Sequence, residues 1–554
     1  MKLKNKTIAS LLTMALLLAS VQVLSTSIVH AGTTLTFLTH WSDTKESGYW
    51  AAVAAKYEAV TGVHIDIISV TFDLLLQEIR LRHASGTDTD LISFYDMWLP
   101  EFANHVSEVV APAPADIVAD VTANWQSISV APSMFKGILY GYPTEYDCWS
   151  LVYNRKVFQD AIDAGQTQLQ PILNKLESKD PLTWDELDTA GRALTTWDTT
   201  VSPPVPIITG FAPMALSAQG RFQWLSLLWS NGGDYYDLSV PEVLFDTPNA
   251  VEAMQLLSDL GYVEPRAYDP MHMPDFWWTA WSEETVGMML LPTWMNYIMD
   301  AMPGYFDHLG VAPIPYNADR VGTQSVSNSY GWMVGVSQKA QDEGRAGAAW
   351  DFLRWLYEPR AAGYIESPDY MPEAYGVAPK GSGCSIMGDW LIFDFTIPSK
   401  IADQQNGHIT VGYWAGHGED GGPITNDFWL SGYMDVANTY GRPTDDNLKS
   451  AQQDAEINLM FDRVIQSGGN PAVEVHDAAL RVQAVLPMSG DVNLDDTVNI
   501  QDVPLIIADI DATPAVPQWT RGRSEFAMDP DTKEYVIDVL DITVLSTNYG
   551  RTSG

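Results

Sequence analysis

The stretch TLTFLTHWSDTKESGYWAAVAAKYEAVTGVHIDIISV, residues 34–70, contains two different hydrophobic periods in succession. It opens on a short apolar run, continues with apolar residues at helical spacing between Trp50 and Val60, and closes on an alternation of period two. These patterns predict a strand, a helix and a second strand. A second helical pattern near residues 74–81 leads into another apolar run, which ends at Trp98. Strands that alternate with helices indicate α/β units around a mostly parallel sheet.

The α/β character continues to about Ile465. In PLTWDEL, residues 181–187, Thr183 stands three residues before Glu186, which is the spacing of a capping box and predicts a helix start. In FDTPNAVEAMQLL, residues 245–257, Thr247 is the expected cap and Pro248 the first helical residue. Beyond Gly468 the composition loosens and then turns to short acidic loops, so we expect a domain boundary around residue 485.

The N-terminus carries Lys2, Lys4 and Lys6 ahead of an apolar stretch and a small-residue exit at residues 29–31. This pattern predicts a secretory signal peptide over residues 1–31, with an uncleaved N-terminal anchor as the alternative. No later run of eighteen apolar residues appears in the sequence. We therefore expect a secreted protein, extracellular or associated with the cell surface.

Charge and cysteine content exclude several classes of protein. The chain has 70 Asp and Glu against 30 Lys and Arg, for a net charge of −40. This excess argues against nucleic acid or an anionic membrane as partner. The two cysteines, Cys148 and Cys384, are too few for a disulfide-built scaffold. We expect them to be unpaired and buried, although the sequence leaves their pairing open.

Aromatic residues gather at the ends of predicted strands. Four of the twenty tryptophans, Trp41, Trp98, Trp294 and Trp332, occupy such places. In open α/β sheets, ligands bind at the carboxyl ends of the strands. Flat rings there suit the C–H faces of sugars, and carboxylates accept hydrogen bonds from sugar hydroxyls. A single tryptophan is more often core than site, but four in equivalent places indicate a ligand cleft.

Seven stretches, in chain order, resemble the extracellular solute-binding proteins of ABC importers, the family that includes maltose-binding protein. They are GILYGYPTEYDCWSLVYNRKVF (residues 137–158), PLTWDEL (181–187), WSNGGDYYD (229–237), FDTPNAVEAMQLL (245–257), EETVGMMLLPTW (283–294), LGVAPIPY (309–316) and DFWLSGYMDVANTYGRPTDDNLKSAQQD (427–454). The resemblance covers roughly residues 34–470. It implies an α/β, two-lobed periplasmic-binding-protein-like fold with a multi-crossing hinge and a ligand trapped between the lobes.

The resemblance also implies site residues. Asp147 matches an acidic hinge position that contacts sugar hydroxyls, and Trp429 matches a stacking aromatic residue of a late helix. Phe222 and Trp224 fall where the second lobe offers an aromatic ring, and Tyr95 and Asp96 fall where the first lobe supplies contacts. With Glu145 and the four tryptophans at strand ends, the predicted ligand-binding set is Trp41, Tyr95, Asp96, Trp98, Glu145, Asp147, Phe222, Trp224, Trp294, Trp332 and Trp429.

A metal-binding pattern lies in GDVNLDDTVNIQD, residues 490–502. Counting from Asp491, oxygen donors fall at positions one, three, five, seven, nine and twelve, which is the spacing of an EF-hand-like calcium loop. These donors are Asp491, Asn493, Asp495, the Thr497 carbonyl, Asn499 and Asp502. Asp496 stands where such loops usually have Gly. A poorer second copy, which needs one extra residue, consists of Asp529, Asp531, Glu534, Asp538 and Asp541.

Each loop leads into an apolar segment, and together they resemble a dockerin module. The resemblance implies a small α-helical calcium-binding module at residues 490–554 and a cohesin-like surface partner. The expected organisation is therefore a signal peptide (1–31), a two-lobed solute-binding domain (32–475), a linker (476–489) and the dockerin-like module.

The leading functional hypothesis is a carbohydrate-binding receptor without catalysis. It would deliver an oligosaccharide to the membrane subunits of an ABC importer and be tethered through its tail. The alternative is a secreted, dockerin-bearing glycoside hydrolase, which would need two carboxylates across the scissile bond. Glu145 and Asp147 are the nearest candidates, but on one strand they are not an obviously opposed pair. Motifs for other hydrolase, zinc-protease or nucleotide chemistry are absent from the sequence.

Overall fold

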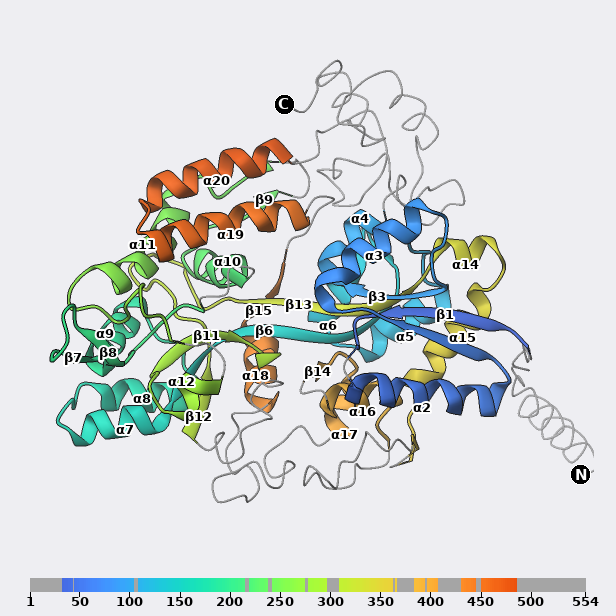
Figure 1. Ribbon diagram of the computed structural model, residues 1–554, viewed down its shortest axis with the longest axis horizontal. Coiled ribbons are helices and arrows are strands. Elements are labelled where there is room, and N and C mark those ends of the chain that lie inside the picture. The colour runs from blue at the N-terminus through green and yellow to red at the C-terminus, as the bar shows by residue number, and fades with distance from the viewer. Residues whose placement is uncertain are drawn as a thin grey trace, which may run out of the picture.

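Two lobes lie side by side in the computed structural model, joined by long strands that run through both (Figure 1). The structure describes residues 32–42, 44–103, 108–214, 219–237, 242–274, 278–295, 308–361, 364–365, 383–393, 396–406, 430–444 and 450–485. A nine-stranded mixed sheet has the order β11-β6-β13-β3-β1-β2, with β12 and β14 also paired to β6 and β15 paired to β13.

The first lobe contains the predicted strand, helix and strand. These are β1 (Thr34–Thr39), α2 (Thr44–Thr61) and β2 (His64–Ser69), with β1 and β2 parallel over six residue pairs. β3 (Leu91–Tyr95) pairs in parallel with β1 on its other side and is completely buried. The predicted α/β pattern of this region is therefore confirmed.

Helices cover both faces of the first-lobe sheet. They include α3 (Phe72–Ala84), α15 (Ala346–Tyr357) and α16 (Ile386–Phe393). Leu38 of β1 joins one hydrophobic core, while its neighbour Phe37 joins the other. This division follows from the alternation of side chains along a strand.

Two long strands connect the lobes: β6 (Tyr142–Asn154) and β13 (Ser327–Val336), both buried along their whole length. From Tyr142 to Cys148, β6 pairs with antiparallel β13. From Trp149 to Asn154, it pairs instead with β11 (Met288–Pro292) and β12 (Leu309–Ala312). The change of partner between Cys148 and Trp149 marks the passage of the chain from one lobe to the other. Here α18 (Leu430–Tyr440) packs on β6.

The second lobe is mainly helical. Its elements include α7 (Arg155–Asp163), α8 (Leu169–Glu177), α9 (Trp184–Leu194), α10 (Gly220–Ser230), α11 (Pro248–Tyr262) and α19 (Ser450–Ser467). Both hydrogen bonds of the predicted capping box of α9 are present. The Glu186 backbone N–H donates to the Thr183 hydroxyl, and the Thr183 backbone N–H donates to the Glu186 carboxylate. Pro248 begins α11 as expected, but Thr247 makes no side-chain capping hydrogen bond.

The second lobe ends at the boundary expected around residue 485 and not at the predicted domain end, residue 475. Helix α20 (Pro471–Val485) packs against α11 and α19 and buries Val475 and Val482. Residues 476–485 are therefore part of the folded lobe and not of a linker, because their apolar positions recur at helical spacing and find a partner surface. The predicted signal peptide (1–31), the rest of the linker (486–489) and the calcium module (490–554) lie outside the described residues.

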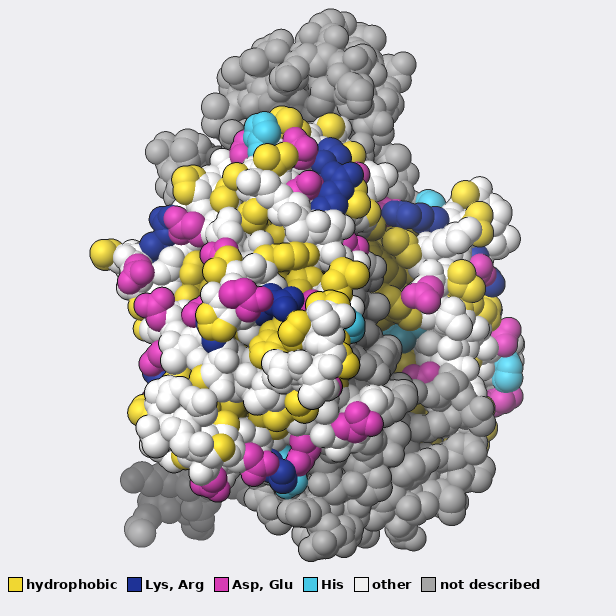
Figure 2. All heavy atoms as spheres, turned by 60° about the vertical axis from the view of Figure 1, so that its left-hand side comes forward, with side chains coloured by type: hydrophobic (Ala, Val, Ile, Leu, Met, Phe, Trp, Pro, Cys, Tyr) yellow, Lys and Arg dark blue, Asp and Glu magenta, His cyan; other side chains and the backbone are white. Residues whose placement is uncertain are grey.

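On the face of the second lobe drawn in Figure 2, acidic side chains are scattered among apolar and uncharged ones. The negative charge is therefore not gathered into one patch on this face. Within the described ranges, no helix combines the length and the apolar character that crossing a membrane requires.

Candidate functional site

The pairing of three strands at the lobe junction sets out a row of site residues. In this register, Tyr95 of β3 lies opposite Trp332 of β13, and Trp332 lies opposite Glu145 of β6. Directly paired residues point to the same face of a sheet, so the three side chains are neighbours. Tyr330 lies two residues before Trp332, is paired with Asp147, and shares that face with it. The predicted residues Tyr95, Glu145, Asp147 and Trp332 are thus brought together.

The rings of this row touch one another. Tyr95 meets Trp332 edge to face with ring centroids 4.4 Å apart, and it stacks on Trp98 at 5.4 Å. Trp98 ends the short turn η1 (Asp96–Trp98) that follows β3, so it lies at the carboxyl end of a strand as expected. Trp332, in contrast, lies inside β13 and not at its end.

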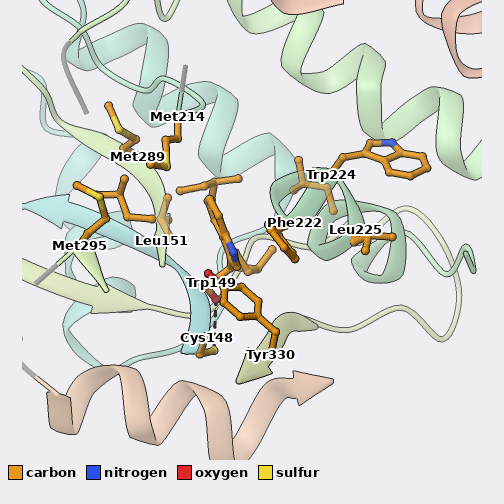
Figure 3. Close-up of a cluster of buried hydrophobic side chains, with 14 of the residues drawn as sticks. Cys148, Trp149, Leu151, Met214, Phe222, Trp224, Leu225, Met289, Met295 and Tyr330 are labelled. Carbon is orange, nitrogen blue, oxygen red and sulfur yellow. Dashed lines mark hydrogen bonds between the residues drawn. The ribbon is translucent and has the colours of Figure 1, made fainter. Parts of the chain in front are cut away.

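Two aromatic rings of the second lobe, Phe222 and Trp294, contact Tyr330. Phe222 of α10 lies 4.6 Å from Tyr330, and Figure 3 shows it pointing toward Trp149 and Tyr330. Trp294, two residues after β11, donates a hydrogen bond from Nε1 to Tyr330 Oη at 3.0 Å. We call the set Tyr95, Asp96, Trp98, Glu145, Asp147, Phe222, Trp294, Tyr330 and Trp332 the junction cluster. Trp294 is half-buried, whereas the other members are buried.

Two carboxyl groups of the junction cluster are buried. Glu145 is 5% exposed and Asp147 is 2% exposed. Burial, followed by the negative charge of Asp147, raises the pKa of Glu145 to about 8, against a hydrogen bond from Thr396. Burial, followed by the charge of Asp96, raises the pKa of Asp147 to about 8, against a hydrogen bond from the Trp294 backbone N–H. Asp147 Oδ1 accepts no hydrogen bond from the described residues.

Two predicted residues lie elsewhere, in hydrophobic core. Trp41 stacks on Trp50 with ring centroids 4.4 Å apart, within the core between the first-lobe sheet and its helices. Its neighbour His40 points the other way and stacks on Trp332 at 3.8 Å. Side chains just after β1 still alternate between the two faces of the sheet. His40 therefore points to the junction, and the next residue, Trp41, points into the core.

Trp224 lies on the side of α10 away from the junction, as Figure 3 shows. It contacts Phe245 at 5.1 Å and donates a long hydrogen bond to the Ala250 carbonyl. Residues two apart in a helix point in nearly opposite directions, which explains why Phe222 reaches the cluster and Trp224 does not. Trp429 lies outside the described residues, so its predicted role stays a prediction.

The sequence interpretation missed three residues of this region: His40, Trp149 and Tyr330. Tyr330 could have been found from Trp332, because positions two apart in a strand share a face. Trp149 follows Glu145 and Asp147 in the same way and packs near Phe222 with centroids 6.3 Å apart. Burial lowers the pKa of His40 to about 3, so its ring is neutral beside Trp332.

The described residues contain neither a disulfide between the two cysteines nor a candidate metal site. Cys148 and Cys384 are buried and do not form a disulfide with each other. Burial raises the pKa of the Cys148 thiol to about 12, so it stays protonated. No group of three or more His, Cys, Asp or Glu among the described residues could hold a metal ion. The candidate calcium ligands from Asp491 to Asp541 fall outside these residues.

Residues 41–363, more than half of the chain, match the family model of the bacterial extracellular solute-binding proteins. Binding proteins of Brucella abortus and Brucella suis are 24% identical over 335 residues, which is 59% of this chain and 73% of theirs.

Solved structures share the fold at low identity. An ABC transporter solute-binding protein from Thermotoga lettingae, bound with α-D-tagatose, has a TM-score of 0.57 and 18% identity, covering 81% of this chain and 99% of that one. The GacH receptor of Streptomyces glaucescens, solved unliganded and with acarbose, has a TM-score of 0.56 and 16% identity, covering 82% and 99%. Maltose-bound MalE3 of T. maritima has a TM-score of 0.57 and 15% identity, covering 82% and 100%. The chain belongs to the bacterial extracellular solute-binding proteins, a family of binding receptors and not of enzymes.

Proposed function

We propose that this protein binds an oligosaccharide at the junction cluster and delivers it to the membrane subunits of an ABC importer. The observation that carries the proposal is the register of β3, β13 and β6, which places aromatic rings and two buried carboxyls on one face where the lobes meet. Aromatic rings suit the apolar faces of sugars, and carboxyl groups hydrogen-bond to hydroxyls. The solved relatives with bound maltose and acarbose support a saccharide ligand.

The connection between the lobes supports a mechanism by closure. β6 and β13 are continuous through the junction, so a small change in their backbone angles turns one lobe against the other. Phe222 and Trp294 move with the second lobe, while Tyr95 and Trp98 move with the first. A ligand that touches both sets favours the closed arrangement, because only there does it make all of these contacts.

A thermal-shift screen against neutral and charged oligosaccharides tests the proposal. We expect at least one saccharide to raise the melting temperature and small-angle scattering to show compaction with it. Steady release of reducing ends by the purified protein would instead support the glycoside hydrolase. The placement of Glu145 and Asp147 on the same face of one strand speaks against that alternative, since hydrolysis needs carboxyls on two sides of the bond.

For the two termini, the proposal rests on sequence spacing. Residues 1–31 would direct export, and N-terminal sequencing of the secreted protein should then begin near Gly32. Residues 490–554 would form the dockerin-like module. Calcium would be held by the oxygen donors from Asp491 to Asp502 and by the poorer set from Asp529 to Asp541. A small module with clustered carboxylates depends on calcium for much of its folding free energy. A cohesin-like partner would then tether the receptor to the cell surface.

Calcium titration of the full chain tests the tail. We expect heat on addition of calcium to chelator-treated protein, and loss of the high-affinity event in Asp491→Ala with Asp495→Ala. Asp160→Asn, which removes one surface carboxylate from α7, serves as the control for non-specific calcium binding. Equal titration curves for all three proteins would overturn the calcium site and, with it, the argument for tethering.

A further inference from the structure

We propose that the solute bound at the junction cluster carries a protonated amine, so that the ligand class is an amino-bearing saccharide and not a neutral one. The inference rests on the proposed function of the junction cluster as the binding site. Its starting point is the pair Glu145 and Asp147, two residues apart on β6, buried, and directed to the face that Trp332 and Tyr330 share.

The protein supplies no cation to this pair from its described residues. The negative charge of Asp96 acts on Asp147, and the negative charges of Asp147 and Glu46 act on Glu145. The other titratable groups whose electrostatics involve the pair are Tyr95, Cys148, Tyr330, Tyr357 and Tyr433. Neither carboxyl forms an ion pair with a Lys, Arg or His in the described ranges. Among the described residues, the two acidic side chains therefore have only neutral or negative neighbours.

The hydrogen bonds of Asp147 leave one of its oxygens available to a ligand. One of its oxygens accepts a hydrogen bond from the backbone N–H of Trp294, which belongs to the second lobe. Its Oδ1 is buried and accepts no hydrogen bond in the part of the chain that the structure describes. A buried acceptor without a donor is costly, and a charged donor offsets that cost better than a neutral hydroxyl.

The surrounding rings suit a cation as well. Tyr95, Trp332 and Tyr330 stand beside the two carboxyls, and Trp294 is held against Tyr330 by its indole N–H. The negative face of an aromatic ring attracts an ammonium group, most strongly where water is excluded. A sugar hydroxyl has no comparable interaction with these rings. Two carboxyls without a positive partner among the described residues, together with the rings beside them, thus favour an amine over the corresponding alcohol.

Ionisation gives the proposal a second signature. The two carboxyls hold their protons at neutral pH because burial raises both pKa values, helped by the charge of Asp147 at Glu145 and of Asp96 at Asp147. An ammonium group favours the ionised carboxylate, so its binding releases protons from the protein, whereas a neutral sugar has no such preference. We therefore expect affinity for the amine to increase from pH 6 to pH 8 as long as the ligand itself remains protonated.

The experiment compares matched sets of α-1,4- and β-1,4-linked disaccharides that carry an amine, an N-acetyl group or a hydroxyl at the same carbon. Isothermal titration at pH 7, in two buffers of different ionisation enthalpy, measures affinity and proton release together. We expect the amine member to bind about tenfold more tightly than its matched alcohol, as one charge-assisted hydrogen bond provides. We also expect it alone to release protons on binding.

Variants separate the site from the general negative charge of the chain. Asp147→Asn and Glu145→Gln keep the shape of each side chain and should abolish both the preference for the amine and the proton release. Asp160→Asn removes one negative charge on α7 and should leave both unchanged. Neutral or N-acetylated members that bind as well as the amine would overturn the inference but leave the proposed saccharide receptor intact. Failure of every saccharide to bind would count against both.

Discussion

Two groups of aromatic residues in the first lobe look alike in the sequence and differ in their surroundings. In the core between the sheet and its helices, Trp41 stacks on Trp50, and both meet Trp390 edge to face. In the junction cluster, Tyr95, Trp98 and Trp332 form a similar set of contacts, but Glu145 and Asp147 stand among them. Ring contacts alone therefore do not identify a binding site. What distinguishes the junction cluster from the group of Trp41, Trp50 and Trp390 is that two buried carboxyls, Glu145 and Asp147, lie among its rings.

The largest expected effect is a loss of folding stability when Trp41 is removed from the core group. Trp41→Ala removes a side chain that is 1% exposed and leaves a cavity lined by Trp50 and Trp390. We expect the free energy of unfolding to fall by about 3 to 5 kcal/mol, measured by urea denaturation. Ligand affinity of the folded fraction should be unchanged. A variant with wild-type stability and weakened binding would place Trp41 at the site after all.

The next effect concerns pH and the carboxyls of the junction cluster. Their folded pKa values of about 8 lie above the unfolded values of about 4, so the folded chain binds more protons between these limits. The stability contribution is present below pH 4 and is lost as pH rises through about 8. Asp147→Asn should therefore stabilise the protein at pH 8, by on the order of 1 to 3 kcal/mol, and have little effect at pH 4.

Thermal unfolding of the wild type, Asp147→Asn and Glu145→Gln at a series of pH values measures this effect. Asp403→Asn provides a contrast: burial also raises the pKa of Asp403, but this carboxyl accepts hydrogen bonds from both the backbone and the side chain of Ser385, which its replacement weakens. Its replacement should destabilise the protein at pH 8. If the melting temperatures of wild type and Asp147→Asn changed with pH in parallel, the pKa of Asp147 would not be raised in the folded protein.

The smallest effect is on binding through Trp294. Since this ring is half-buried, Trp294→Ala should change the melting temperature little. It should reduce saccharide affinity by about 0.5 to 1.5 kcal/mol beyond the buried area lost, measured by titration calorimetry. Trp224→Phe is the control, because Trp224 faces away from the junction and its replacement should lower stability without changing affinity. The reverse pattern would exchange the roles of the two tryptophans.

Local patterns in the sequence were sufficient for much of the fold. The strand, helix and strand of residues 34–70 formed where their hydrophobic periods predicted, because these periods reflect which face of an element is buried. The capping box of Thr183 and Glu186 is equally local, since both hydrogen bonds close within four residues. Resemblance to the solute-binding family added the two lobes, which no local pattern contains.

The sequence by itself determined the elements, the family, and the types of residue available for binding, and the tertiary structure decided which of these residues meet. Tyr95, Trp332 and Glu145 are far apart in the chain and form one row only because β3, β13 and β6 pair in a particular register. The same register made Tyr330 a neighbour of Asp147. The side chain just after β1 that reaches the junction is His40, because Trp41 fills the core on the opposite face. Register depends on the packing of distant segments, and a shift of one residue reverses the faces of a strand.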